Sequence, residues 1–368
     1  MAGIVTLLYG CILLLLLWFW RSRKFPVLSS KENQNVFATI IIPVRNESKN
    51  IIRLIRSIHE GEKDKQGFEI IVVDDHSEDD TKAVVKLLQS EYENLNYVEL
   101  SANHLGKKAG ITWGARLAKG DLIVCTDGDS EVASGWLDTH KHAFASGTKL
   151  AFGPVKLFNL NGSRWIDMLN QELAALVGVG AATLQMGKPT MINGCNYSFS
   201  KDAFEEVNGF TGNEEIASGD DEFLLRKIHK TYPNQIKFLK SEKALVTSEP
   251  PKNLSEFINQ RRRWASKWRF HQDGFSMIAP LFIFCIYSIW GWLLIDACST
   301  MNPLGFFVLS AKFGIDYLFI NSVSRIQNSK VSLFSFILLQ IIYPFYVVFF
   351  GLASNFGKYR WRDRIHKI

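Results

Sequence analysis

The chain has 368 residues, of which 47% are hydrophobic and 21% are charged, and its formal net charge is +6. This length accommodates one large domain and several membrane helices. The modest charge, with no zinc-finger spacing or RNA-binding aromatic motif in the sequence, argues against a nucleic-acid partner. The five scattered cysteines argue against a disulfide framework or a cysteine metal site.

Residues 4–20 form an almost unbroken apolar run that ends in an aromatic cluster at 18–20. Three basic residues follow at once, namely Arg21, Arg23 and Lys24. A cleaved signal peptide, which is the alternative, carries its charges before the apolar stretch rather than after it. The order found here predicts a retained transmembrane anchor over residues 1–24, with the next segment on the cytoplasmic side.

Residues 37–250 show the pattern of a cytoplasmic α/β domain. Short β-branched runs at 39–42, 70–73 and 122–125 predict buried parallel strands. Apolar residues recur at helical spacing over 48–58 and 81–88. This alternation predicts βαβ units and a doubly wound, mostly parallel sheet. Ligands of such sheets bind at the carboxyl ends of the strands, where polar clusters occur in this sequence.

The last third of the chain is again apolar. Residues 251–274 predict an amphipathic helix at the membrane interface, and residues 275–368 predict a membrane region with a basic tail. The runs 275–297 and 331–353 are long enough to span a bilayer. The run 303–320 is shorter and carries Lys312 and Asp316, which would pair or snorkel.

We expect two full C-terminal spans, with 303–320 re-entrant or interfacial. Two spans return the tail to the cytoplasmic side, as the positive-inside tendency requires, whereas three would place it outside. The basic residues of this tail are Lys358, Arg360, Arg362, Arg364 and Lys367.

The segment Asp127-Gly128-Asp129 follows an apolar strand. Carboxylate oxygens suit Mg²⁺ or Mn²⁺, and Mg²⁺ commonly takes one or two carboxylates together with substrate phosphates. We therefore predict a metal site at Asp127 and Asp129 that neutralises a departing diphosphate. The alternative is an ordinary turn, which this composition also favours.

Polar residues also end the first two predicted strands. Pro43 and Glu47 follow the first strand, and Asp74 and Asp75 follow the second. Carboxylates at such positions can accept hydrogen bonds from a base or from ribose hydroxyls. We therefore predict that Glu47, Asp74 and Asp75 bind a nucleotide donor, and that Pro43, at the same strand end, lines the donor site. Helix capping is the alternative for any one of them.

Two further segments carry candidate catalytic and donor-binding groups. Lys107 or Lys108, at the start of a predicted helix, would reach a diphosphate, although both would also be explained as solvated surface lysines. Asp220 and Asp221 precede an amphipathic helix, and either would serve as a general base that removes a proton from an acceptor hydroxyl. Their mutual repulsion would raise one pKa, whereas the alternative role is to cap the helix.

The segment 260–264 contains Gln260, Arg263 and Trp264. An arginine here would bind a diphosphate through two parallel hydrogen bonds, and the tryptophan would stack on a sugar ring. The alternative is a basic helix that binds anionic lipid.

Together these motifs resemble the family 2 inverting glycosyltransferases with a GT-A fold. The resemblance is to their membrane-integrated branch, which includes cellulose, chitin and hyaluronan synthases and ceramide glucosyltransferases, and it covers residues 37–268. It implies a metal-dependent transfer from a UDP-sugar more often than a GDP-sugar, with inversion at the anomeric carbon.

The resemblance also implies roles for individual residues. Asp74 and Asp75 look like the uridine-contacting acids, Lys107 or Lys108 like the donor-binding lysine, and Asp127-Gly-Asp129 like the metal motif. The segment from Gly194 to Ser198, with Asn196, resembles the acceptor lining, and Gln260, Arg263 and Trp264 fit the Gln-x-x-Arg-Trp signature. One departure is Gly219, where the family usually has Glu. The register of Glu222 and Arg226 favours Asp220 over Asp221 as the base.

We therefore expect a hexosyltransferase in a bacterial inner membrane, with a cytoplasmic catalytic domain and a lipid or glycan acceptor. Few candidate spans favour single or limited transfer over the alternative of a processive polysaccharide synthase. A catalytically inactive nucleotide-binding membrane scaffold is a second alternative. A phosphatase that forms an aspartyl-phosphate is a third, but it would leave Asp74, Asp75 and the Gln-x-x-Arg-Trp segment without a role.

Overall fold

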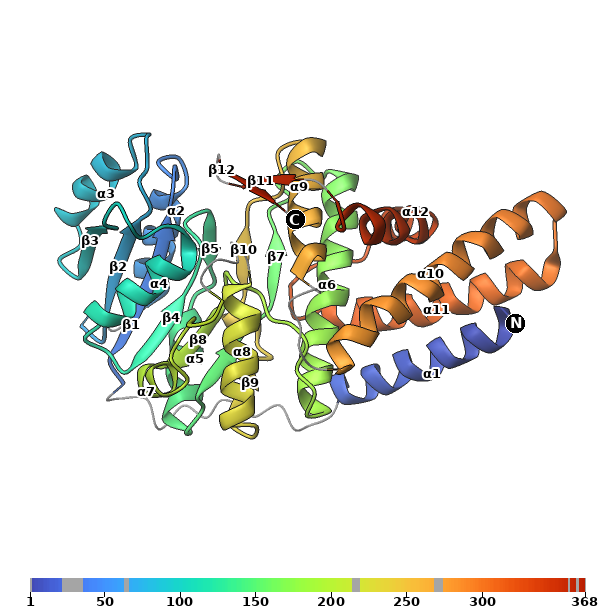
Figure 1. The fold of residues 1–368 in the computed structure, drawn as a ribbon, viewed down its shortest axis with the longest axis horizontal. Coiled ribbons are helices and arrows are strands. Elements are labelled where there is room, and N and C mark those ends of the chain that lie inside the picture. The colour runs from blue at the N-terminus through green and yellow to red at the C-terminus, as the bar shows by residue number, and fades with distance from the viewer. Residues whose placement is uncertain are drawn as a thin grey trace.

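The structure is a computed structural model that describes residues 2–21, 36–62, 66–213, 219–267, 274–356, 358–361 and 364–367. An α/β domain forms one end of the molecule, and long apolar helices extend from its side (Figure 1). Arg23, Lys24 and Arg362, which contribute to the predicted charge pattern, lie outside the described residues.

The centre of the α/β domain is a seven-stranded sheet with the order β3-β2-β1-β4-β8-β6-β9. All neighbours run parallel except β8, which is antiparallel to both β4 and β6. The predicted mostly parallel sheet is thereby confirmed. The strands are β1 (Ala38–Val44), β2 (Phe68–Asp74), β3 (Leu95–Glu99), β4 (Leu122–Cys125), β6 (Leu150–Phe152), β8 (Tyr197–Ser200) and β9 (Ile236–Phe238).

A second, three-stranded sheet lies at the carboxyl end of β4. It consists of β5 (Ser130–Val132), β10 (Val246–Ser248) and β7 (Val155–Leu157), with β10 in the middle. Because Ser248 pairs with Ser130, this sheet brings a segment from the end of the domain beside the Asp127–Asp129 turn.

Helices cover both faces of the large sheet. The predicted apolar stripe of α2 (Ile51–Gly61) is confirmed, since Ile51, Leu54, Ile55 and Ile58 are fully buried. Its face also carries α3 (Thr81–Gln89) and α5 (Trp136–Ala145). The other face carries α4 (Gly106–Leu117), α6 (Arg164–Gln185), α7 (Lys201–Glu206) and α8 (Asp220–Thr231).

Helix α6 joins this domain to the apolar helices. Val177 of α6 shares one core with Trp20 of α1 (Ala2–Arg21) and Phe319 of α11 (Pro303–Ser324). At Gly178, an added Cβ would lie only 2.6 Å from the side chain of Val323, so glycine permits the close approach of α6 and α11. The remaining elements are α9 (Leu254–Ser266), α10 (Gly274–Thr300), α12 (Leu333–Ala353), β11 (Lys358–Trp361) and β12 (Arg364–Lys367).

Among the described residues, four helices, α1, α10, α11 and α12, are long and apolar enough to cross a membrane. The expectation for 303–320 is a re-entrant or interfacial segment. The structure differs from the re-entrant alternative, because α11 is one continuous helix of 22 residues. Its two charges are accommodated by pairing within the helix. The Lys312 ammonium lies 2.9 Å from the Asp316 carboxylate, which also accepts a 2.6 Å hydrogen bond from the Tyr9 hydroxyl.

Glu62 should make the stability of the domain depend on pH. Its side chain is buried and accepts a 3.1 Å hydrogen bond from the Leu137 backbone N–H. Burial, followed by the charge of Asp138, raises the pKa of Glu62 from 4.5 to about 7. A carboxyl group whose pKa is raised by folding stabilises the fold at pH values below its ordinary pKa of 4.5. This contribution is lost as the pH rises through about 7.

Glu62→Gln is therefore expected to raise the free energy of unfolding by about 1–3 kcal/mol at pH 8.5 (roughly one to two pKa units). Thermal unfolding in detergent at about pH 5 and pH 8.5 measures this, and little change is expected at the lower pH. Glu60→Gln, at an exposed position in the last turn of α2, two residues before Glu62, is the control. An equal gain at both pH values would show that removal of the charge is not the cause.

Candidate active site

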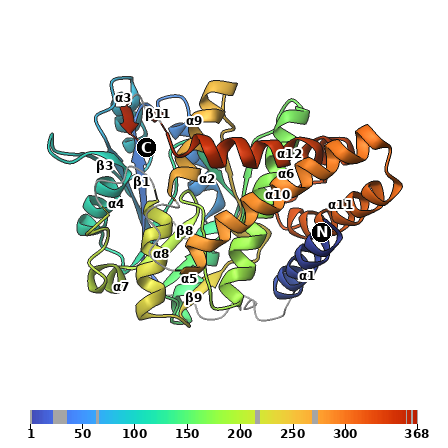
Figure 2. The same cartoon turned by 45° about the vertical axis from the view of Figure 1, so that its right-hand side comes forward.

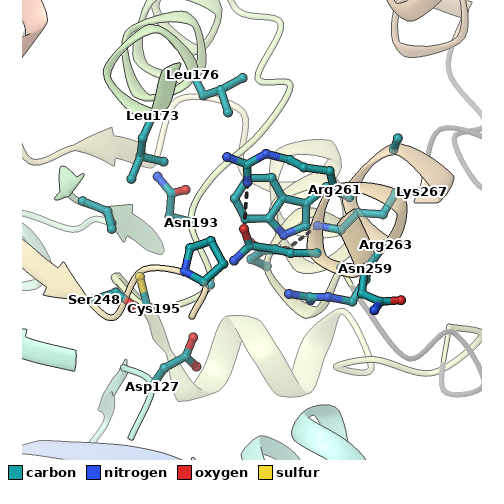
Figure 3. A pocket seen from close by; sticks show the side chains of 18 of the residues that line it. Asp127, Leu173, Leu176, Asn193, Cys195, Ser248, Asn259, Arg261, Arg263 and Lys267 are labelled. Atoms are coloured by element: carbon teal, nitrogen blue, oxygen red, sulfur yellow. Dashed lines mark hydrogen bonds and ion pairs between the residues drawn. The ribbon is translucent and has the colours of Figure 1, made fainter. Parts of the chain in front are cut away.

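A cavity of about 1910 Å³ opens where β1, β2 and β4 end, and it extends to α9, α10 and α12. Figure 3 shows Asp127 on one side and Arg261, Arg263 and Lys267 on the other. Most residues predicted for the site line this cavity, namely Pro43, Glu47, Asp75, Lys107, Asp127, Asp129, Gly194, Asp220, Asp221, Gln260, Arg263 and Trp264.

The loops after β1 and β2 hold each other in place. Arg45 donates hydrogen bonds of 2.9 and 2.7 Å to the carbonyl oxygens of Asp75 and His76. Asp75 lines the cavity, and its carboxylate accepts a 3.0 Å bond from the Gly106 backbone N–H. Asp74 instead accepts bonds from the Ser77 N–H and the Tyr97 hydroxyl, so the structure gives it a role in fixing the loop.

Lys107 is the centre of the charged part of the cavity. Its ammonium lies 2.7 Å from the Asp127 carboxylate and 3.3 Å from that of Asp220, and it donates to the Gly194 carbonyl at 2.7 Å. Burial alone would lower the pKa of Lys107, but the two carboxylates raise it overall. Lys107 is therefore a cation under all physiological conditions and joins three segments that are distant in the sequence.

Lys108 turns away from this cluster. Its ammonium donates a 2.5 Å hydrogen bond to the Asn213 carbonyl and lies 4.8 Å from the centre of the Phe223 ring. Of the two lysines that the sequence left open, only Lys107 lines the cavity.

Asp127 and Asp129 fit the donor set of a divalent cation that is completed by a substrate. Both line the cavity, and the Asp127 side chain is about one-third exposed, at 34%. Ser248 donates to Asp129 at 3.3 Å. Within the described residues, no three His, Cys, Asp or Glu side chains converge to hold a metal by themselves. A site with two carboxylates leaves the remaining positions for phosphate oxygens, as Mg²⁺ prefers.

Asp220 and Asp221 occupy the first turn of α8, where the helix dipole favours negative charge. Gly219 precedes them with a φ of 82°, and an added Cβ would lie 2.9 Å from the Phe223 ring. This left-handed backbone explains why glycine replaces the glutamate expected from the family pattern.

The two aspartates have different surroundings. Asp220 is paired with Lys107, and the Tyr197 hydroxyl lies 3.5 Å from its carboxylate. Asp221 lies 3.7 Å from Lys267 and accepts a bond from the Glu222 N–H. Burial raises the pKa of Asp221 and outweighs the opposing effect of Lys267, so that the net value is about 6. A carboxylate with a pKa raised in this way suits a general base that works near neutral pH.

Helix α9 forms the wall opposite the strand ends. Gln260, Arg263 and Trp264 line the cavity as predicted. Arg261 is 5% exposed; it donates to Gln260 at 2.9 Å and its guanidinium lies 4.3 Å from the centre of the Trp264 ring.

Arg261 is held from behind by Glu172 of α6, at 2.6 Å. The Tyr346 hydroxyl of α12 donates to the same carboxylate at 2.7 Å. Sequence reasoning did not identify Glu172, Arg261, Tyr346 or Lys267, because these partners are distant in the chain. The sequence shows Glu172, Arg261 and Lys267 only as charged residues within helical patterns, and Tyr346 only as a polar group in an apolar run.

Asn196 does not contact the cavity as the acceptor prediction required. It is fully buried and accepts bonds from Trp136 and His140 while donating to the carbonyls of Pro154 and Ala244. Its amide is fully used in joining these segments. The neighbouring backbone of Gly194, in contrast, lies against Lys107, Asp220 and Asp221.

This fold and this arrangement of carboxylates, lysine and Gln-x-x-Arg-Trp helix are those of a GT-A glycosyltransferase domain. Residues 39–207 match the model of the family "Glycosyl transferase family 2". This match lies within the α/β domain and confirms the resemblance to glycosyltransferase family 2 found in the sequence.

Curated relatives support this assignment. Glycosyltransferase AglE of Haloferax volcanii is 25% identical over 201 residues, which are 53% of this chain and 62% of the relative. Beta-monoglucosyldiacylglycerol synthase of Trichormus variabilis is 24% identical over 62% of this chain and 48% of the relative. The matched part therefore spans about half to three-fifths of these relatives.

A solved structure shares the fold over nearly the whole chain. The mannosyltransferase PcManGT from Pyrobaculum calidifontis, in complex with GDP-Man and Mn²⁺, aligns with a TM-score of 0.56. The alignment covers 96% of this chain and 98% of the PcManGT chain, at 16% sequence identity. The similarity includes the apolar helices as well as the α/β domain.

Proposed function

We propose that the protein transfers a sugar from a nucleotide-sugar donor to a lipid or membrane-associated acceptor, with inversion. The observation that carries this proposal is the two-sided cavity. One side is the Lys107–Asp127 cluster, and the other includes Leu281 and Phe284 of α10 and Val347 of α12. A polar nucleotide diphosphate suits the first side, and an amphiphilic acceptor suits the second. The names of the relatives, including beta-monoglucosyldiacylglycerol synthase, agree with such an acceptor.

At the donor side, each group has a defined task. Asp75 would accept hydrogen bonds from the nucleoside, and Lys107 and Arg263 would bind the diphosphate. Asp127 and Asp129 would hold Mg²⁺ or Mn²⁺, which would neutralise negative charge on the leaving diphosphate. We favour a UDP-sugar, as the family resemblance implies, and the GDP-Man bound to the neighbour makes GDP-sugars the first alternative.

At the reacting centre, Asp221 is proposed as the general base. It removes the proton from an acceptor hydroxyl, whose oxygen attacks the anomeric carbon from the side opposite the diphosphate. The new carbon–oxygen bond forms as the bond to the diphosphate breaks, and the nucleoside diphosphate leaves with the electron pair. Asp220 acts differently in this proposal, by holding Lys107 against the donor.

The apolar helices support a reaction that takes place at a membrane. We propose that the catalytic domain faces the cytoplasm, as the basic residues after α1 suggest. We further propose a single or limited transfer, since α1, α10, α11 and α12 are few for a polymer channel.

Nucleotide release by the detergent-purified protein tests the proposal. The assay contains Mg²⁺ or Mn²⁺, UDP- and GDP-sugars in turn, and membrane lipid as acceptor. We expect one donor to be used, with release that requires both metal and lipid. Removing the metal with EDTA, or replacing Asp127 by Asn, should lower release by about 10²-fold or more, since a metal supplies several kcal/mol of charge stabilisation.

Asp202→Asn is a control, because Asp202 pairs with Lys149 outside the cavity. Nucleotide binding without release from any donor would instead support an inactive scaffold. Absence of nucleotide binding would refute the proposed function altogether.

A further inference from the structure

Helix α12 differs from the other apolar helices in how its ends are placed. Helices α10 and α11 form a hairpin whose turn at residues 301–302 lies far from the α/β domain, near the N-terminus of α1 (Figure 1). Helix α12 instead passes over α10 close to the domain (Figure 2). The two helices are in contact there, since the Gly351 Cβ position lies 2.8 Å from the Phe284 ring.

The beginning of α12 is attached to the α/β domain. In the preceding loop, Gln327 donates a 2.7 Å hydrogen bond to the carbonyl of Val155 in β7. Gln171 of α6 donates to the carbonyl of Ser332, the N-cap of α12, at 3.2 Å. The Arg164 guanidinium, at the start of α6, lies 4.4 Å from the centre of the Phe334 ring.

The end of α12 is attached to the same domain. Phe350 packs on Leu169 of α6 and on Phe257 of α9, with the two rings 6.0 Å apart. Beyond the helix, Arg262 of α9 donates to the Phe356 carbonyl. Strand β11 then contacts α9, so the chain stays on this side.

A helix that crosses a bilayer must place its two ends on opposite sides of about 30 Å of hydrocarbon. Both ends of α12 contact the α/β domain, which is water-exposed and lies at one end of the molecule. The 21 residues of α12 therefore run along the domain rather than away from it.

The outer face of α12 is apolar along its whole length. Its buried face carries Ser335, Phe336, Leu339, Gln340, Pro344 and Phe350. The exposed face carries side chains spaced three or four residues apart, and the series continues beyond the end of the helix at Ala353: Phe334, Ile337, Ile341, Phe345, Phe349, Leu352 and Phe356. Such a stripe needs an apolar partner along all of its length.

We propose that α12 lies within the membrane leaflet next to the catalytic domain, with this stripe against its acyl chains, and that only α1, α10 and α11 cross the bilayer. The proposal rests on the membrane location in the proposed function. It makes the apolar side of the cavity, between α10 and α12, open to the same leaflet. It also places the basic C-terminal strands on the side of the catalytic domain, which satisfies the positive-inside tendency that a fourth crossing would violate.

Labelling of single cysteines in sealed proteoliposomes tests the proposal. The exposed cysteines Cys11, Cys285 and Cys298 are first replaced by serine, and the two buried ones are kept. Single cysteines are then introduced at Asn302, Asn328 and Asn355, with Lys230→Cys on α8 as the reference for the catalytic side. A membrane-impermeant maleimide should label 328, 355 and 230 from one side and 302 from the other. Labelling of 328 and 355 from opposite sides would overturn the proposal.

The depth of α12 gives an independent measurement. Spin labels at Phe334, Ile341 and Phe349 should report similar depths by relaxation with oxygen and a water-soluble nickel complex. A crossing helix would instead show position 341 far deeper than the other two. Neither measurement requires turnover. If the protein had this topology but no transferase activity, the proposed function would be refuted and the inferred position of α12 in the leaflet would stand.

Discussion

Replacing Asp221 by Asn is expected to lower kcat by about 10²–10⁴-fold, the range that a general base contributes. Donor affinity should change little, because the ion pair of Asp221 is with Lys267, whereas Lys107 pairs with Asp127 and Asp220. The variant keeps the shape of the side chain but cannot take up a proton. Single-turnover rates and donor binding, measured on the same preparation, separate the two effects.

Asp220→Asn is the matched control, one residue away in the same helical turn. Asp220 pairs with Lys107, so its loss should mainly raise the KM for the donor. The opposite pattern, a catalytically dead Asp220→Asn and an active Asp221→Asn, would make Asp220 the base, as the spacing to Arg226 favoured.

The pH dependence provides a second readout for Asp221. A base with a pKa of about 6 is deprotonated above that value, so kcat should fall as the pH drops through 6. The contribution of Asp221 to the stability of the fold changes with pH in the opposite direction to kcat. A carboxyl pKa raised by burial stabilises the fold at low pH, and this contribution is lost as the pH rises through 6. Asp221→Asn should therefore be more stable than the parent protein at pH 8 while being less active.

Breaking the Glu172–Arg261 pair is expected to have the largest effect on stability. The two side chains are each 6% exposed and lie 2.6 Å apart. Loss of one partner leaves a buried charge without compensation, which costs about 3–5 kcal/mol. Arg261→Met should therefore lower the free energy of unfolding by this amount, as measured by thermal unfolding in detergent.

Activity should fall as well, because Arg261 supports residues that line the cavity. It donates to Gln260 and stacks on Trp264. The double variant Glu172→Gln/Arg261→Met removes both charges and should recover part of the lost stability, but not the activity. Arg262→Met, on the same helix, is the control, since Arg262 reaches the Phe356 carbonyl in an exposed position. Additive losses in the double variant would show that the two residues do not act as a pair.

Much of this protein was determined by local sequence. The β-branched runs specified β1, β2 and β4, because such runs are typical of buried parallel strands. Parallel strands end at one edge of a sheet, so Asp75 and Asp127 had to come together there. The helical spacing of Ile51, Leu54, Ile55 and Ile58 specified the buried face of α2. The family followed from the motifs that these elements carry.

Only the tertiary structure decided between adjacent candidates. Adjacent residues point in different directions, so Asp75 and Lys107 line the cavity, while Asp74 and Lys108 turn to other partners. Asn196 is used entirely inside the domain, which a motif match does not reveal. The direction of each side chain depends on neighbours from remote segments, so the spacing of residues along the chain does not predict it.

The same reason explains the membrane region. Length and hydropathy identified α10, α11 and α12 as apolar helices, since those properties are local. They did not identify which ends meet the α/β domain. That depends on contacts such as Gln171 with Ser332 and Phe257 with Phe350, between residues far apart in the sequence. The sequence by itself thus determined the main elements and the family resemblance, and the long-range packing determined which side chains line the cavity and which ends of α12 contact the α/β domain.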